Sequence, residues 1–148
     1  MGIEDQIKAN YKNEHHKAVV NIRFTSNWLG TYHNKQLEKF ELTLPQFNIL
    51  RILRGAKEKI SIKVVKERML EKSPNTTRLV DKLIQKKLVK RNRCKTDRRV
   101  VYIEITQSGQ DLLSAIDDVF DEFNMENKLS KQEAVQLNTL LDKIRAPE

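Results

Sequence analysis

The stretch that decides the fold is KSPNTTRLVDKL, residues 72–83, within a segment that runs from Ser61 to Ile105. Ser73 is a favoured N-cap residue and Pro74 suits the first turn, so a helix is predicted to start here. At 100° per residue, its apolar and polar side chains fall on opposite arcs. The apolar arc comprises Leu79, Val80, Leu83 and Ile84, and the polar arc comprises Arg78, Asp81, Lys82 and Gln85. We therefore expect the apolar arc to be buried and the polar arc to face a partner.

A short helix is predicted before this stretch and a β-hairpin after it. Ser61 is expected to cap a helix that runs from Ile62 to about Leu70. Residues 88–93 and 100–106 are expected to form two strands, and the second alternates apolar and polar side chains. The six residues between them, 94–99, hold four charges and should project into solvent. The predicted order is thus helix, turn, helix and charged hairpin.

The charge of the chain is concentrated in the same segment. The formal net charge is +8. Residues 51–105 hold 18 Lys and Arg against 6 Asp and Glu, or +12, whereas the rest holds 10 against 14, or −4. A local positive field favours a polyanion at one face. Charge alone would equally fit a solvated basic surface.

Composition indicates one helix-rich domain. A chain of 148 residues can bury a real core, and its 4 Gly and 3 Pro are few for a β-sandwich. The single cysteine, Cys94, excludes an internal disulfide framework and suits a reducing compartment. There is no apolar run after a basic start and no stretch of about 20 apolar residues, so we expect no signal peptide, no membrane span and a cytoplasmic location.

The N-terminal part predicts one long helix from Ile3 to about Leu37, with apolar residues at three- and four-residue steps. About 30 residues give about 45 Å of helix, which is too long for one small domain to cover. Part of this stripe is therefore expected to pack on another helix, from this subunit or from a second one.

Three further helices follow from capping residues. The expected caps are Thr43, Thr106 or Ser108, and Ser130. The first of these helices should end at Gly55 and the second at about Asn124. Both C-terminal helices carry Leu- and Phe-rich stripes.

No constellation for catalysis, metal or cofactor binding is present in the sequence. The four glycines are scattered, and His15 and His16 are adjacent, so on a helix they point about 100° apart. His33 and Cys94 have no metal-ligand spacing. We expect no cofactor and no enzyme activity. Cys94, next to Arg93, could have a lowered pKa and act as a redox sensor, but an inert cysteine at a strand end is favoured.

Duplex DNA is the partner that fits this pattern. The second helix of a helix-turn-helix enters the major groove, where Arg, Asn and Thr suit base edges and phosphates. The expected contacts of this helix are Ser73, Pro74, Asn75, Thr76, Thr77, Arg78 and Lys82. An Arg-tipped ribbon fits the minor groove, and the expected contacts of the hairpin are Arg91, Arg93, Lys95, Asp97, Arg98 and Arg99. Asp97 is expected to orient a neighbouring Arg, and Ser61 and Lys63 to contact the DNA backbone.

Two other interpretations remain open. The hairpin could be a solvated charged turn. The basic face could also belong to a winged-helix module that binds an acidic protein partner.

The sequence resembles the MarR family of bacterial winged-helix transcription regulators over nearly its whole length. The pieces that carry the resemblance are LPQFNIL (residues 44–50), KSPNTTRLVDKL (72–83), Asp97-Arg98-Arg99, and ITQSG (105–109). Each piece alone is weak, but their order and spacing are specific. The resemblance implies a mainly α fold with a small β-hairpin wing (α+β), as a single domain over residues 1–148. It places dimerisation helices at about 3–37 and 107–145, and a DNA-binding lobe at about 44–106.

The resemblance also implies a function. It implies a homodimer that places two recognition helices about one turn apart on a pseudo-palindromic operator. Such regulators are commonly repressors, released by a small aromatic or anionic effector between the dimer helices and the lobe. The candidate pocket residues are His15, His16, Trp28, Tyr32 and Phe47. Ordinary core and dimer packing is the favoured interpretation for any one of them.

Overall fold

The computed structural model describes residues 1–70, 75–119 and 128–147. Its elements, in chain order, are α1 (Ile3–Gln6), α2 (Glu14–Leu37), η1 (Glu38–Phe40), α3 (Leu44–Ala56), β1 (Ile60–Ser61), α4 (Ile62–Arg68), α5 (Thr76–Gln85), β2 (Val89–Arg93), β3 (Val101–Ile105), α6 (Gln107–Asp117) and α7 (Lys131–Arg145). None of the described helices combines the length and the hydropathy that a bilayer crossing requires.

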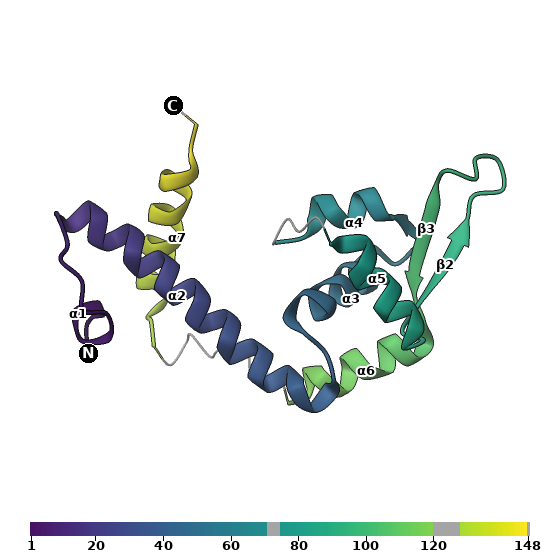
Figure 1. Cartoon of the computed structure of the whole chain (residues 1–148), viewed down its shortest axis with the longest axis horizontal. Helices are drawn as coiled ribbons and strands as arrows, with labels where there is room; N and C mark the ends of the chain where they lie inside the picture. The colour runs from purple at the N-terminus through teal and green to yellow at the C-terminus, as the bar shows by residue number, and fades with distance from the viewer. Residues whose placement is uncertain (71–74, 120–127, 148) are drawn as a thin grey trace.

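The elements separate into a lobe with a wing and an extended helical part (Figure 1). Helices α3, α4 and α5 and the sheet form the lobe, α6 lies beneath it, and β2 and β3 project from it as the wing. Helix α2 leads away from the lobe toward α1, and α7 and both termini lie at that far end. This confirms the predicted fold class, a mainly helical winged helix-turn-helix with long terminal helices.

Four of the predicted helix caps are present, at Thr43, Ser61, Thr106 and Ser130, whereas the predicted cap Ser73 lies outside the described residues. Thr43 and Gln46 exchange hydrogen bonds at the start of α3, as Ser130 and Glu133 do at the start of α7. Ser61 Oγ accepts from the Val64 amide at 3.3 Å and so caps α4. Local side-chain acceptors satisfy amides that the first turn leaves unpaired, which is why short sequence patterns place these boundaries correctly.

The core lies around α3. Phe47, Leu50 and Leu53 are at most 2% exposed, and α3 contacts α2, α4, α5, α6 and β3. Val65, Val80 and Ile103 bring one fully buried side chain each from α4, α5 and β3. Such burial provides most of the favourable free energy that positions α5 on the lobe.

The antiparallel sheet has three strands, in the order β1-β3-β2. The predicted hairpin is present, with Val89 paired to Ile105 and Arg93 paired to Val101. The strand β1 was not predicted from the sequence. It has two residues, Ile60 and Ser61, which is too short for an alternating pattern, and only its pairing with β3 defines it.

The prediction of one helix from Ile3 to Leu37 is wrong. Helix α1 ends at Gln6, Ile7 is extended, and α2 starts at Glu14. Asn13 Oδ1 accepts from the His16 amide at 2.9 Å, which caps α2 and stops its extension toward the N-terminus. Asn side chains compete with the helix for backbone amides, so they favour a cap over a helix interior.

Other predicted boundaries shift by short distances. Gly55 does not end α3, because the helix continues to Ala56 and Lys57 takes the left-handed conformation, with φ of 57°. Helix α4 ends at Arg68, before the predicted Leu70. Helix α6 ends at Asp117, before the predicted end near Asn124; residues 120–127 lie outside the described part of the chain.

Candidate nucleic-acid interface

Helix α5 is held on the lobe by the apolar arc that the sequence predicted. Val80 and Leu83 are fully buried, and Leu79 is half-buried. Arg78 and Lys82 are exposed and form no ion pair with another described residue. The predicted division of the helix is confirmed, and it leaves two cations directed to solvent.

The N-terminal end of α5 differs from the prediction, because the helix starts at Thr76 and its N-cap is Asn75, which makes no side-chain capping bond. Thr76 is only 1% exposed, and its hydroxyl lies 3.5 Å from the sulfur of Met69 in the lobe. A buried hydroxyl cannot contact DNA, so Thr76 is a packing residue and not a contact. Asn75 and Thr77 are exposed. Ser73 and Pro74 lie outside the described residues.

At the base of the wing, the charges are paired within the chain. Lys90 Nζ lies 2.9 Å from Glu104 Oε1, and Asn92 Nδ2 donates to the same oxygen at 3.0 Å. The hydrogen bond from Lys90, followed by that from Asn92, lowers the pKa of the Glu104 carboxyl. Arg91 does not point freely to solvent either, because its guanidinium donates to Asp81 on α5.

At the tip of the wing, the cations are exposed. Arg93, Lys95 and Arg98 have no ion-pair partner among the described residues. Asp97 Oδ1 accepts from Arg99 Nε at 3.1 Å and from the Arg99 amide at 3.0 Å. These two bonds, the side-chain one first, lower the pKa of Asp97. The expected pairing of Asp97 with an Arg is confirmed, and Arg99 stays 92% exposed.

Cys94 marks the boundary between base and tip and is half-buried. Its sulfur lies 3.1 Å from the Thr96 hydroxyl. That hydrogen bond, followed by those from the backbone of Asp97 and of Thr96, lowers the pKa of the Cys94 thiol. The direction agrees with the expectation from the sequence, but local hydrogen bonds cause the shift, and not the flanking cations.

The first turn of α4 adds a cation to this interface. Lys63 is exposed, and Ser61 is half-buried because its hydroxyl caps the helix. The last turn of α4 carries two more exposed cations, Lys66 and Arg68, which the sequence interpretation did not single out.

The five candidate effector residues do not form one cluster within the chain. Trp28 and Tyr32 stack with ring centroids 6.1 Å apart, and Phe47 is buried at 2% exposure in the core. His16 precedes Trp28 by 12 residues of α2, about 18 Å along the axis, and His15 is exposed beside it. The stacked pair of Trp28 and Tyr32 is thus separated along α2 from the two histidines.

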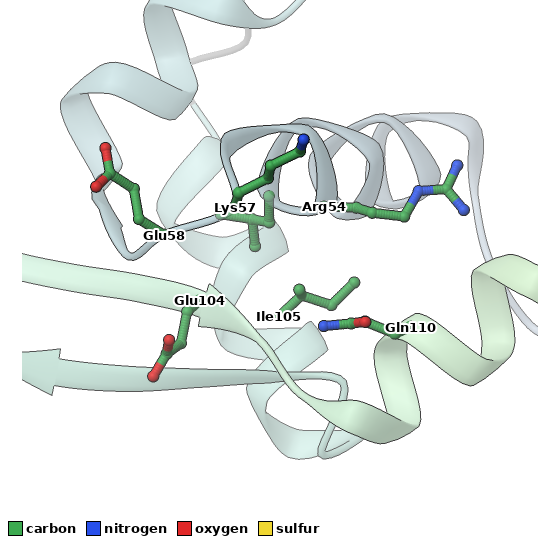
Figure 2. A pocket seen from close by; sticks show the side chains of 7 residues that line it. Arg54, Lys57, Glu58, Glu104, Ile105 and Gln110 are labelled. Atoms are coloured by element: carbon green, nitrogen blue, oxygen red, sulfur yellow. The ribbon is translucent and has the colours of Figure 1, made fainter.

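A hollow of about 100 Å³ lies between the end of α3, β3 and the start of α6 (Figure 2). The charged ends of Arg54, Lys57 and Glu58 at its rim point in different directions, and Arg54 pairs with Asp117 at 2.6 Å. Within the described residues, no three His, Cys, Asp or Glu side chains gather as metal ligands. The exposed cations of α4, α5 and the wing tip therefore remain the strongest candidate site.

Comparison with known proteins identifies the family of the chain. Residues 31–116 match the family model described as transcriptional regulator SarA/Rot. The chain is 33% identical over 113 residues to the HTH-type transcriptional regulator MgrA of Staphylococcus aureus, with 76% of each chain covered. It is 30% identical over 118 residues to the HTH-type transcriptional regulator MhqR of Bacillus subtilis, with 78% and 81% covered. The structure superposes on S. aureus MepR in its DNA complex with a TM-score of 0.77 and 26% identity, over 85% and 94% of the two chains.

Proposed function

The chain belongs to the SarA/Rot family of MarR-type winged-helix transcription regulators, and on that premise we propose that it is a homodimeric, sequence-specific repressor. Membership makes it a helix-turn-helix DNA-binding regulator and not an enzyme. The proposal adds the two-fold assembly, a pseudo-palindromic operator and the direction of regulation.

The observation that carries the proposal is the division of α5 into a buried apolar arc and an exposed basic arc beside a wing with an Arg tip. Arg78 and Lys82 are available to the major groove. Arg99, oriented by Asp97, is available to the adjacent minor groove. A module that bound an acidic protein would need the cations but not this helix-and-ribbon geometry.

The terminal helices support the homodimer. Leu140 and Ile144 of α7 are 59% and 64% exposed, and Trp28 of α2 is 44% exposed. Such apolar surface on two long helices is typical of an interface between subunits. A two-fold axis through these helices would place two copies of α5 on one face of DNA.

Release by a small aromatic or anionic effector is part of the same proposal. The stacked pair of Trp28 and Tyr32 lies on α2, which connects the lobe to the proposed dimer interface. An aromatic ligand can stack on such a pair. Trp28 is the only tryptophan, so its fluorescence reports a ligand there directly.

The test starts with selection of duplexes from a random pool by the wild-type protein. Arg78→Ala should lower discrimination between the selected duplex and a scrambled one by about 1–3 kcal/mol if Arg78 contacts a base. Arg99→Ala should weaken binding and flatten the salt dependence. Lys143→Ala, which removes one exposed charge from α7, is the matched control and should leave discrimination unchanged.

Two results would overturn the proposal. The first is a wild-type protein that enriches no duplex at moderate salt but captures an acidic protein. The second is a monomer at micromolar concentration in sedimentation, because a monomer cannot occupy two symmetric half-sites.

A further inference from the structure

Arg91 and Asp81 form an ion pair across the corner between the recognition helix and the wing. Arg91 Nη2 donates to Asp81 Oδ1, and the two residues lie in the middle of β2 and of α5. Their side chains are 37% and 49% exposed. A pair that is this exposed contributes little to the free energy of unfolding, because water and salt screen it. Stability therefore does not account for its placement.

The location of Asp81 is costly for a DNA-binding face. Asp81 lies on the exposed arc of α5 with Arg78 and Lys82. An unpaired carboxylate there would repel phosphates and work against the counterion release that drives binding. Pairing with Arg91 neutralises it. The same contact occupies the guanidinium that the sequence assigned to DNA.

The base of the wing is also held by the core, in which Val89 of β2 and Ile103 of β3 are buried. Backbone hydrogen bonds from the Leu88 amide to Leu83 O, at 3.0 Å, and from the Lys87 amide to Ile84 O, at 2.9 Å, join α5 to the start of β2. Beyond β1, the ribbon has only two strands, and an isolated two-stranded ribbon is marginally stable in water. Arg91 pairs with Ile103, which pairs with Ile60 of β1, so the link to Asp81 lies in the last part of the three-stranded sheet, just before the two-stranded ribbon begins.

We infer that Asp81 and Arg91 are a positioning pair that sets the angle between the recognition helix and the wing. The hydrogen bond from Arg91 Nη2 to Asp81 Oδ1 joins the middle of β2 to the middle of α5. With the angle set, Arg78 and Arg99 can engage neighbouring grooves of the same site at once. Arg91 is thus a positioning residue and not a phosphate contact. The predicted effect on DNA binding rests on the proposed function, whereas the role of the pair in setting the angle of the wing does not.

The effect of removing Asp81 distinguishes this role from simple electrostatics. If Asp81 were only a negative charge near DNA, Asp81→Asn would tighten binding to every duplex. If it positions the wing, Asp81→Asn should raise affinity for a scrambled duplex slightly while it lowers the preference for the selected duplex by about tenfold.

The double variant Asp81→Asn/Arg91→Gln keeps the net charge of the wild type. Its preference for the selected duplex over a scrambled duplex of equal length and base composition should also fall about tenfold. The matched control is Lys90→Gln/Glu104→Gln, which removes the other ion pair at the wing base without touching α5. We expect that control to change the preference by less than about twofold, as for a surface pair.

A second readout needs no DNA. Amide hydrogen exchange of residues 89–105 should be several-fold faster in Asp81→Asn than in the wild type, with an unchanged thermal midpoint. The charge-reversed pair Asp81→Arg/Arg91→Asp should restore slow exchange, and it guards against a variant that simply fails to fold.

Two outcomes overturn the inference. One is equal tightening of both duplexes by Asp81→Asn. The other is exchange in the wing that stays at the wild-type rate in every variant. Failure of the wild type to enrich any duplex would instead overturn the proposed function. Hydrogen exchange in the wing would still show whether Asp81 and Arg91 position it.

Discussion

The lobe and the terminal helix α7 differ in how far their apolar side chains are buried within the chain. In the lobe, Leu50 and Leu83 are fully buried by neighbours from the same chain. In α7, no described residue is buried, although Leu140 and Ile144 recur at helical spacing. The lobe is thus complete within one chain, whereas the terminal helices present a stripe that only another surface can cover.

The two regions should therefore differ in how their stability depends on protein concentration. Burial within the lobe does not depend on protein concentration. Burial of the α7 stripe in the proposed dimer depends on protein concentration, because the dimer forms only from folded chains and its fraction rises with concentration. Matched substitutions in the two regions test this contrast.

The largest effect is expected for Leu50→Ala in the lobe. It should lower the free energy of unfolding by about 2–5 kcal/mol, because it removes buried methyl groups and leaves a cavity. The measurement is urea unfolding at two protein concentrations, and the loss should be the same at both.

Leu140→Ala on α7 is the matched substitution outside the lobe. It should change the unfolding of the lobe by less than about 0.5 kcal/mol, as for an exposed position, and weaken self-association in sedimentation. An equal loss from both substitutions, independent of concentration, would contradict the contrast between the two regions.

The border between the regions contains Gly109, in the first turn of α6. A Cβ there would lie 2.4 Å from Leu88 O and 2.6 Å from Ile105 Cγ1. Gly109→Ala should lower the free energy of unfolding by about 1–3 kcal/mol, because Leu88 and Ile105 must move away from the added methyl group. Thermal unfolding measures this change.

Gly55→Ala is the control for Gly109. Gly55 lies inside α3, and nothing is within 4 Å of its added Cβ. Alanine there should stabilise by about 0.5–1 kcal/mol, because it reduces the entropy lost on folding. Similar signs for the two substitutions would mean that the start of α6 is not tightly packed on the lobe.

A small stabilising effect is expected at Lys87, between α5 and β2, where φ is 60°. A side chain in the left-handed region costs about 1–2 kcal/mol, and glycine loses about 0.5–1 kcal/mol in entropy. Lys87→Gly should therefore stabilise by up to about 1 kcal/mol. Lys87→Ala keeps the left-handed strain and should not stabilise the protein. An equal gain from the glycine and alanine variants would exclude relief of backbone strain as the cause.

Much of the fold and of the candidate site follows from short stretches of sequence. Thr43, Ser61 and Ser130 cap their helices through contacts three residues away, and Asp97 orients Arg99 two residues away. Such contacts need no distant partner, so a local pattern is sufficient. The prediction of one N-terminal helix was wrong because it followed the apolar stripe alone. The capping signal at Asn13, which is also local, interrupts that helix.

Local sequence patterns specified α3, α4, α6 and α7 with their caps, the division of α5 into two arcs, and the hairpin with its charged tip. Only the tertiary structure decided that Thr76 is buried against Met69 and that Ile60 pairs with Ile103 in a third strand. It also decided that Arg91 binds Asp81. The physical reason is that each of these contacts joins different elements, and no local pattern specifies which surfaces meet when the core closes.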